Sequence, residues 1–223
     1  MPARPPPLVA LAALAAFVVL LVLVAGDWPP LDRADAAFSE ALRAAGTARP
    51  RLVTAARLVT DVAATLPYAL LGLAATATLH VRGHRRPAAF CAVVTVAVPA
   101  LWGLMHWLVH HPRPVDGHAV VTSNSFPSGH TSHAAALALA GVLLGWPVLG
   151  RLGRALAVAA AIGYAVGIGA TRVVLLVHWP SDVLGGWLLA TGVVVAAAHW
   201  TRPHHRRGLS SARPAPGRRP CRR

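Results

Sequence analysis

The sequence predicts an all-α membrane protein, a helical bundle with six transmembrane helices. Three observations predict it: 56% of the 223 residues are hydrophobic, the mean hydropathy is +0.56, and apolar runs of nearly bilayer length recur along the chain. A soluble domain of this size would be more polar, and a membrane-spanning helix needs about 20 apolar residues. We therefore expect one membrane-embedded domain over residues 1–200 and a polar tail over residues 201–223.

Six apolar stretches are candidates for these helices: Leu8–Ala25, Val62–Val81, Ala88–Val109, Thr131–Leu149, Ala155–Ala170 and Val183–Trp200. The fifth is too short unless it continues past Arg172 to Val177, with Arg172 facing the bundle interior, because an arginine exposed to lipid would be costly. The first resembles the core of a signal peptide, since Arg4 precedes it and small residues follow it. An uncleaved helix is favoured because the run exceeds the usual core of about 7 to 15 residues.

Arginine residues predict the orientation of the chain. All 21 basic residues are arginine, and the net charge is +14. Arg4, the segments around Arg85 and Arg151, and the tail after Thr201 are expected in the cytoplasm by the positive-inside rule, together with both termini. The segments expected outside are Gly26–Asp61, His110–His130 and Thr171–Asp182. Topology and anionic lipid explain this basic charge, so no nucleic-acid partner is expected.

Other segments carry no predicted chemistry. Ala36–Ala45 has apolar and polar positions at helical spacing, which favours a short helix on the outer surface that either caps the bundle or covers a lipid entrance. The tail after Thr201 is rich in Pro, Arg and Ser without periodicity, which predicts disorder. Cys91 lies in an apolar stretch and Cys221 in the tail, so no disulfide or thiol-metal site is predicted.

His178 and Asp182 are the first pair that points to chemistry. Pro180, between them, is suited to the first position of a helix. A carboxylate four residues beyond a histidine can accept one ring N–H and leave the other nitrogen bare as a nucleophile. An interfacial histidine with a capping carboxylate would show the same spacing, so the pair alone is a weak indication.

A second motif, Pro127–His130, precedes an apolar stretch. The Ser128 hydroxyl and the backbone N–H groups of Gly129 and His130 can converge at the positive end of a helix dipole, which is a ready anion site. His130 would then stand beside the bound group as a proton donor. The ordinary alternative is a serine N-cap, and His133, one turn further on, is interpreted as a packing residue.

Arg113 and Arg172 lie at predicted outer membrane boundaries. By default each would pair with lipid headgroups, but their planar donor groups match phosphate geometry, and convergence on one anion would use both. His106, seven residues before Arg113, projects toward the same region from the third stretch. His110 is expected to share its helical face.

Together these residues resemble the type 2 phosphatidic acid phosphatase (PAP2) superfamily. Its pattern is Lys-x6-Arg-Pro, then Pro-Ser-Gly-His, then Ser-Arg-x5-His-x3-Asp. Within residues 105–186, the positions in register are Arg113-Pro114, Pro127–His130, Arg172, His178 and Asp182. His106 stands where the family has Lys, and Thr171 where it has Ser. Thr171 keeps the hydroxyl group, whereas His106 is charged only part of the time.

The resemblance implies a metal-independent lipid phosphatase of the cell membrane, with its active site on the extracytoplasmic face. His178 would attack phosphorus, Asp182 would orient it, and His130 would protonate the leaving oxygen and then activate water. The residues implied to hold the phosphoryl oxygens are Arg113, Arg172, Ser128, Gly129, Thr171 and His106. The implied partners are a lipid phosphate or pyrophosphate substrate and membrane lipid, with no cofactor and no metal.

Two other functions fit parts of the sequence. Some members of the same superfamily are vanadate-dependent haloperoxidases, although these are soluble and much larger. A non-enzymatic metal-binding or transport protein would instead use the histidine cluster, in which His106 and His110 are spaced as a metal-binding pair. Activity that survives a chelator favours the phosphatase, whereas metal-dependent spectra or transport favour the metal protein.

Overall fold

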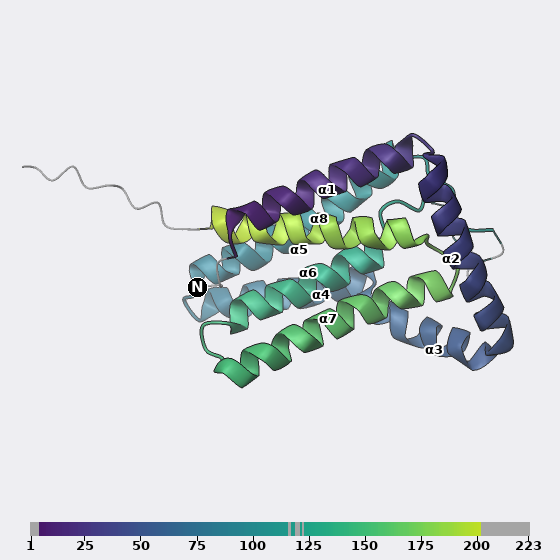
Figure 1. Cartoon of the computed structure of the whole chain (residues 1–223). Helices are drawn as coiled ribbons and strands as arrows, with labels where there is room; N and C mark the ends of the chain where they lie inside the picture. Colours follow the sequence, from purple (N-terminus) through teal and green to yellow (C-terminus); the bar gives the residue numbers. More distant parts are fainter. Residues whose placement is uncertain (1–4, 116, 119–120, 122, 202–223) are drawn as a thin grey trace, which may run out of the picture.

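A computed structural model of the chain describes residues 5–115, 117–118, 121 and 123–201 (Figure 1). These residues form α-helices, one short 3₁₀ helix and connecting loops, and no strand occurs among them. The helices are α1 (Pro7–Ala25), α2 (Pro29–Ala48), α3 (Pro50–Thr60), η1 (Asp61–Ala63), α4 (Thr65–Val81), α5 (Arg85–Leu108), α6 (Gly129–Gly145), α7 (Arg151–Val174) and α8 (Pro180–Trp200). The all-α prediction is confirmed. Most of the predicted tail lies outside the described residues.

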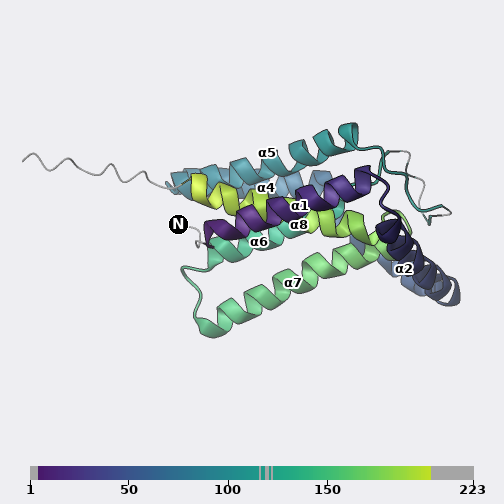
Figure 2. The same cartoon turned by 45° about the horizontal axis from the view of Figure 1, so that its top comes forward.

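The helices α1, α4, α5, α6, α7 and α8 run side by side as a bundle (Figures 1 and 2). In the described part of the chain, five helical stretches are long and apolar enough to cross a membrane: Pro7–Ala25, Pro50–Val81, Arg85–Leu108, Arg151–Val174 and Pro180–Trp200. The protein is therefore a multi-pass membrane protein. Helix α6 has 17 residues and packs against α5, α7 and α8 inside this bundle.

Helix α8 packs against α1 and α6, and small residues let these helices approach closely. A Cβ atom on Gly186 would lie 2.9 Å from the carbonyl oxygen of Ser128 at the start of α6. A Cβ atom on Gly192 would lie 2.5 Å from a methyl group of Leu14 in α1. Lipid tails are as apolar as leucine, so close packing of this kind holds membrane helices together more than hydrophobic burial does.

Helices α2 and α3 cross one end of the bundle (Figure 1). The predicted surface helix Ala36–Ala45 is part of the longer α2, and α3 was not predicted. Asp35 of α2 is buried and accepts hydrogen bonds from the backbone N–H (3.0 Å) and the hydroxyl (2.5 Å) of Ser181 in α8. The described ends of the chain meet at the opposite end of the bundle, where a ring nitrogen of His199 lies 2.8 Å from the carbonyl oxygen of Pro5.

The fifth predicted span ends earlier than expected. Helix α7 stops at Val174 instead of Val177, because the chain turns there and Leu176 adopts a positive φ of 52°. Arg172 therefore lies in the last turn of the helix, where it is 7% exposed and faces the interior as predicted.

Other predicted boundaries also shift at the outer end of the bundle. Helix α6 begins at Gly129, two residues before the predicted start, so His130 is part of its first turn. Helix α4 begins at Thr65, after the 3₁₀ turn. Helix α5 ends at Leu108, and the prediction that His110 shares a helical face with His106 was wrong.

Candidate active site

The candidate active site lies at the end of the bundle where α2 and α3 cross, in the loops that precede α6 and α8. Helix α8 begins at Pro180, as predicted, because proline lacks the N–H that a first helical position leaves unpaired. Asp182, in the first turn, accepts the backbone N–H of Trp179 at 2.8 Å. The same carboxylate oxygen lies 3.3 Å from Nδ1 of His178. The cap of the helix thus fixes the carboxylate that contacts the histidine.

The other ring nitrogen of His178 faces Arg113. One terminal guanidinium nitrogen of Arg113 lies 3.1 Å from Nε2 of His178. Because arginine only donates and a carboxylate only accepts, these two contacts favour the tautomer with a proton on Nδ1 and a bare Nε2. The remaining donors of Arg113 bind the carbonyl groups of Ser123 and Asn124, in the loop before α6, and of Val177, in the loop before α8. Arg113 thus joins these two loops.

Burial keeps the His178 ring neutral. The side chain is 3% exposed, and burial lowers the pKa of His178 to about 4. The hydrogen bond and charge of Asp182 oppose this shift, while the charges of Arg113 and Arg172 add to it. A histidine that is neutral at physiological pH, with one bare nitrogen, has the protonation state of a nucleophile.

The motif Pro127–His130 forms the start of α6. Ser128 is the N-cap residue, but its side chain makes no capping bond. Its hydroxyl oxygen instead accepts a hydrogen bond from Thr131 at 2.9 Å, and its backbone N–H donates to the carbonyl oxygen of Asp182 at 3.0 Å. This backbone bond joins the starts of α6 and α8, and with them the two sequence motifs.

Gly129 and His130 follow in the first turn of α6. A Cβ atom on Gly129 would lie 2.7 Å from the indole ring of Trp102 in α5, so only glycine allows this contact. His130 is half-buried, and its imidazole interacts electrostatically with Arg172, His178 and Arg113. His130 therefore interacts with residues from both of the other motifs.

Arg172 has an N–H group without a partner among the described protein groups, whereas the Thr171 hydroxyl already donates a hydrogen bond. One terminal nitrogen of Arg172 donates to the Thr60 hydroxyl at 2.9 Å, while its buried Nε has no partner among the described protein groups. The Thr171 hydroxyl donates to the carbonyl of Ile168 at 2.6 Å within α7. The hydroxyl hydrogen of Thr171 is thus already used in a bond within α7.

His106 lies on α5, one turn before the end of that helix. Its ring packs on Trp102 with centroids 4.7 Å apart, and neither of its buried nitrogens has a partner among the described protein groups. The indole N–H of Trp102 is likewise without one. Buried polar groups are normally hydrogen-bonded. An oxyanion could accept a hydrogen bond from the indole N–H and from a ring N–H of His106, of which a neutral ring has one and a protonated ring has two.

The sequence indicated His111 only as a member of the histidine cluster and did not single out Ser125. Nδ1 of His111 lies 3.2 Å from the second carboxylate oxygen of Asp182, and the Ser125 hydroxyl oxygen lies 2.9 Å from the same nitrogen. No local spacing could predict these contacts, because 71 residues separate His111 from Asp182. The only available signal was the position of His111 two residues before Arg113.

The histidine cluster does not form a metal site in this structure. Within the described ranges, no group of three or more His, Cys, Asp or Glu side chains is arranged to hold a metal ion. His133 is buried and stacks on Tyr68 with centroids 4.6 Å apart, which agrees with its interpretation as a packing residue.

Comparison with known proteins identifies the family. Residues 88–206, more than half of the chain, match the PAP2 superfamily, and the chain belongs to it. A stretch of 79 residues is 39% identical to phosphatidylglycerophosphatase B of Escherichia coli (strain K12), and the Shigella flexneri protein of that name matches equally. This stretch covers 35% of the chain but only 29% of either relative.

A solved structure has the same fold. The crystal structure of a transmembrane PAP2 type phosphatidylglycerolphosphate phosphatase from Bacillus subtilis superposes with a TM-score of 0.71. The superposition covers 86% of this chain and 95% of that chain, at 24% sequence identity. The protein therefore has the transmembrane PAP2 fold.

Proposed function

We propose that the protein is a membrane lipid phosphatase that hydrolyses lipid phosphates or pyrophosphates through a phosphohistidine on His178. One observation carries the proposal: His178 is held between Asp182 at Nδ1 and Arg113 at Nε2. This contact set leaves Nε2 unprotonated and places it next to a cation that binds phosphate. Arg113 would transfer its hydrogen bond from Nε2 to a phosphoryl oxygen when substrate binds.

In the first step, Nε2 of His178 forms a bond to phosphorus while the bond to the leaving lipid oxygen breaks. His130, which must be the imidazolium at this step and would be stabilised in that form by the bound phosphate anion, gives that oxygen a proton. The His178 ring, now carrying the phosphoryl group, becomes cationic and is stabilised by Asp182. In the second step, His130 takes a proton from water, the water oxygen attacks phosphorus, and the P–N bond breaks. Phosphate leaves, and both histidines return to their starting states.

The phosphoryl oxygens would be held by positive and N–H groups around His178. We assign this role to Arg113, Arg172, His106 and the start of α6 at Ser128 and Gly129. The free Nε of Arg172 and the unpaired nitrogens of His106 support the assignment. Thr171 would contribute only after its hydroxyl leaves the carbonyl of Ile168.

The site would face the outside of the cell. We propose that α6 is a sixth transmembrane helix, because it packs among the other spans although it is shorter than they are. An even number of spans puts both termini on one side, and the arginine-rich segments favour the cytoplasm. Residues 1–200 would then form one membrane domain, with α2 and α3 on the outer surface.

The substrate class is proposed from the site and from the names of the relatives. Phosphatidylglycerophosphate is the first candidate, since relatives from three organisms are phosphatidylglycerophosphatases by name. Phosphatidic acid and polyprenyl pyrophosphate offer the same terminal phosphate.

The test is phosphate release by purified protein from these three lipids, in detergent with a chelator present. We expect release from at least one lipid and none from the His178→Ala variant. Release that stops when the chelator is added, or that persists in His178→Ala, would contradict the proposed chemistry.

A further inference from the structure

Asp182 contacts two histidines, not one. One carboxylate oxygen lies 3.3 Å from Nδ1 of His178, and the other lies 3.2 Å from Nδ1 of His111. Asp182 is fully buried, and His111 is 8% exposed. The Ser125 hydroxyl is 3.4 Å from the carboxylate oxygen that faces His111 and is the weaker partner there.

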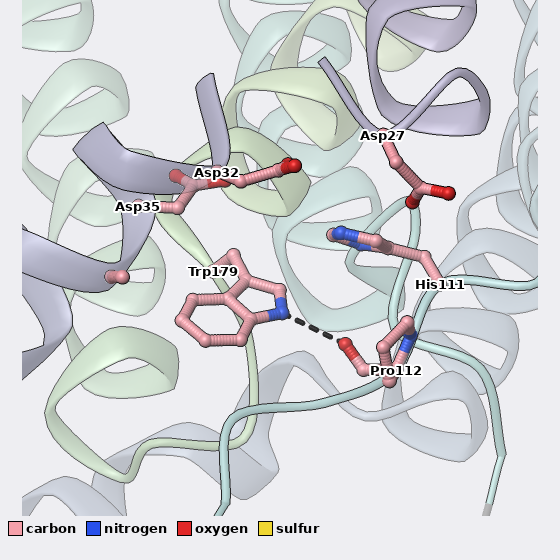
Figure 3. A pocket seen from close by; sticks show the side chains of 7 residues that line it. Asp27, Asp32, Asp35, His111, Pro112 and Trp179 are labelled. Atoms are coloured by element: carbon pink, nitrogen blue, oxygen red, sulfur yellow. Dashed lines mark hydrogen bonds between the residues drawn. The ribbon is translucent and has the colours of Figure 1, made fainter. Parts of the chain in front are cut away.

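The carbonyl groups of His111 and of the next residue both accept hydrogen bonds. The backbone N–H of Ser125 donates to the carbonyl oxygen of His111 at 2.9 Å. The indole N–H of Trp179 donates to the carbonyl oxygen of Pro112 at 2.8 Å, the dashed bond in Figure 3. These bonds attach the loop that carries His111 to the start of α8, where Asp182 lies.

We propose that His111 is a positioning residue for the phosphoryl transfer, which holds the Asp182 carboxylate in the orientation that serves His178. The inference rests on the proposed function. A carboxylate can rotate about its last bond, and a donor on the oxygen remote from His178 opposes that rotation. Without His111, this buried oxygen would keep only Ser125, and the contact to Nδ1 of His178 would loosen.

The charge of His111 depends on Asp182 and on an acidic cavity. His111 borders a cavity of about 300 Å³ together with Pro112 and Trp179. The carboxylates that line it are Asp27 from the turn after α1 and Asp32 and Asp35 from α2 (Figure 3). The charged groups that face His111 are thus these three and Asp182 from α8.

The pKa of His111 follows from these neighbours. Burial acts to lower the pKa, but the hydrogen bond and charge of Asp182 and the charges of Asp35 and Asp32 raise it above the usual value. Below that raised pKa, His111 is a cation and its bond to Asp182 is charge-assisted, which makes it roughly twice as strong as a neutral one. As pH rises through the pKa, the hold on Asp182 weakens, and kcat should fall.

Three variants test the inference by pH profiles of kcat and KM. His111→Phe keeps a ring but removes the donor, and its kcat should fall on the order of 10-fold to 100-fold, the effect of one hydrogen bond to a charged group. KM should change little, because Arg113 and Arg172 remain. His111→Asn places a neutral N–H near the position of Nδ1, so it should restore most of kcat and remove the alkaline decline. His110→Asn, at the exposed neighbouring position, is the matched control and should match wild type.

Two kinetic results would overturn the inference. One is wild-type kcat in His111→Phe. The other is an equal loss in His111→Phe and His111→Asn in protein that folds normally, because the donor would then be irrelevant.

A readout without substrate separates this inference from the proposed function. Without the His111 cation, the negative charge of Asp182 is no longer shared between two histidines and stabilises a protonated His178 more strongly. The pKa of His178 should therefore rise in His111→Asn, and histidine NMR can follow it. An unchanged His178 pKa contradicts the coupling. If that pKa shifts but wild-type protein releases no phosphate from any lipid, the coupling of His111 to His178 through Asp182 stands and the proposed reaction fails.

Discussion

At the scale of single residues, the protonation states of His178 and its neighbours account for the chemistry. The four-residue spacing predicted the contact between His178 and Asp182, because it depends only on the geometry of one helix start. The contacts of His178 with Arg113 and of Asp182 with His111 cross from one loop to another. They could not be predicted from spacing, since they depend on how α5, α6 and α8 pack.

Removal of the nucleophile should abolish the reaction. His178→Ala should release no phosphate, and Asp182→Asn should lower kcat on the order of 10⁴-fold, as loss of the orienting carboxylate does in serine proteases. The acid limb of wild-type kcat/KM, which reports the free enzyme, should lie near pH 4, because the pKa of His178 is lowered to about 4 and the ring is protonated below it. An acid limb near pH 6.5, the usual histidine value, would contradict the assignment.

His106 should act on substrate affinity. If this imidazole replaces the lysine of the family pattern, its cation is lost as pH rises, so KM should increase on the alkaline side. His106→Lys should shift that increase to higher pH, and neutral His106→Ala should bind substrate weakly at every pH. Identical alkaline limbs of kcat/KM in wild type and both variants would show that the arginines hold the phosphate alone.

At the scale of helices, the site depends on where α2, α6 and α8 meet. The sequence predicted the start of α8 at Pro180 and placed the start of α6 within two residues, because proline, serine and glycine mark helix ends locally. It assigned Gly129 to an anion site through its backbone N–H, whereas the structure shows that Gly129 also leaves room for Trp102 of α5. It missed α3 and half of α2, because polar residues interrupt their apolar pattern and their docking depends on contacts with α7 and α8.

Loss of Asp35 should release α2 from α8. In Asp35→Ala, the backbone N–H and the hydroxyl of Ser181 lose their acceptor, at a cost of about 1–3 kcal/mol for each buried group. Amide hydrogen exchange in α2 should accelerate while exchange in α1 stays unchanged. Glu40→Ala, which removes an exposed ion pair of the same helix with Arg43, should leave exchange in α2 nearly as in wild type. Equal acceleration in both variants would argue against a specific anchor.

At the scale of the whole molecule, the candidate active site lies at one end of the bundle and the described termini meet at the other. The alternation of arginine-rich and other segments predicted this separation, because it reflects membrane topology and not packing. Composition also predicted the membrane class. The exact helix limits could be predicted less well from the sequence, because the turn at Leu176 and the short α6 follow from the contacts of the outer loops.

Cysteine labelling tests the orientation. Val115 and Val148 lie at opposite ends of the bundle and are 73% and 85% exposed. In a Cys221→Ser background, a membrane-impermeant maleimide applied to intact cells should label Val115→Cys and not Val148→Cys, because we place the site outside. Cys91 is buried and should not react. The opposite labelling pattern would place the site in the cytoplasm.

Detection of the phosphorylated enzyme tests the central claim most directly. Protein mixed with a ³²P-labelled lipid phosphate in chelator and quenched at alkaline pH should carry an acid-labile phosphoryl group on His178. With a lipid pyrophosphate, whose leaving phosphate needs no proton, the signal should be larger in His130→Ala, which lacks the residue that activates water. The signal should be absent in His178→Ala. Phosphate release by wild type with no trace of a phosphorylated histidine in either wild type or His130→Ala would contradict transfer through His178.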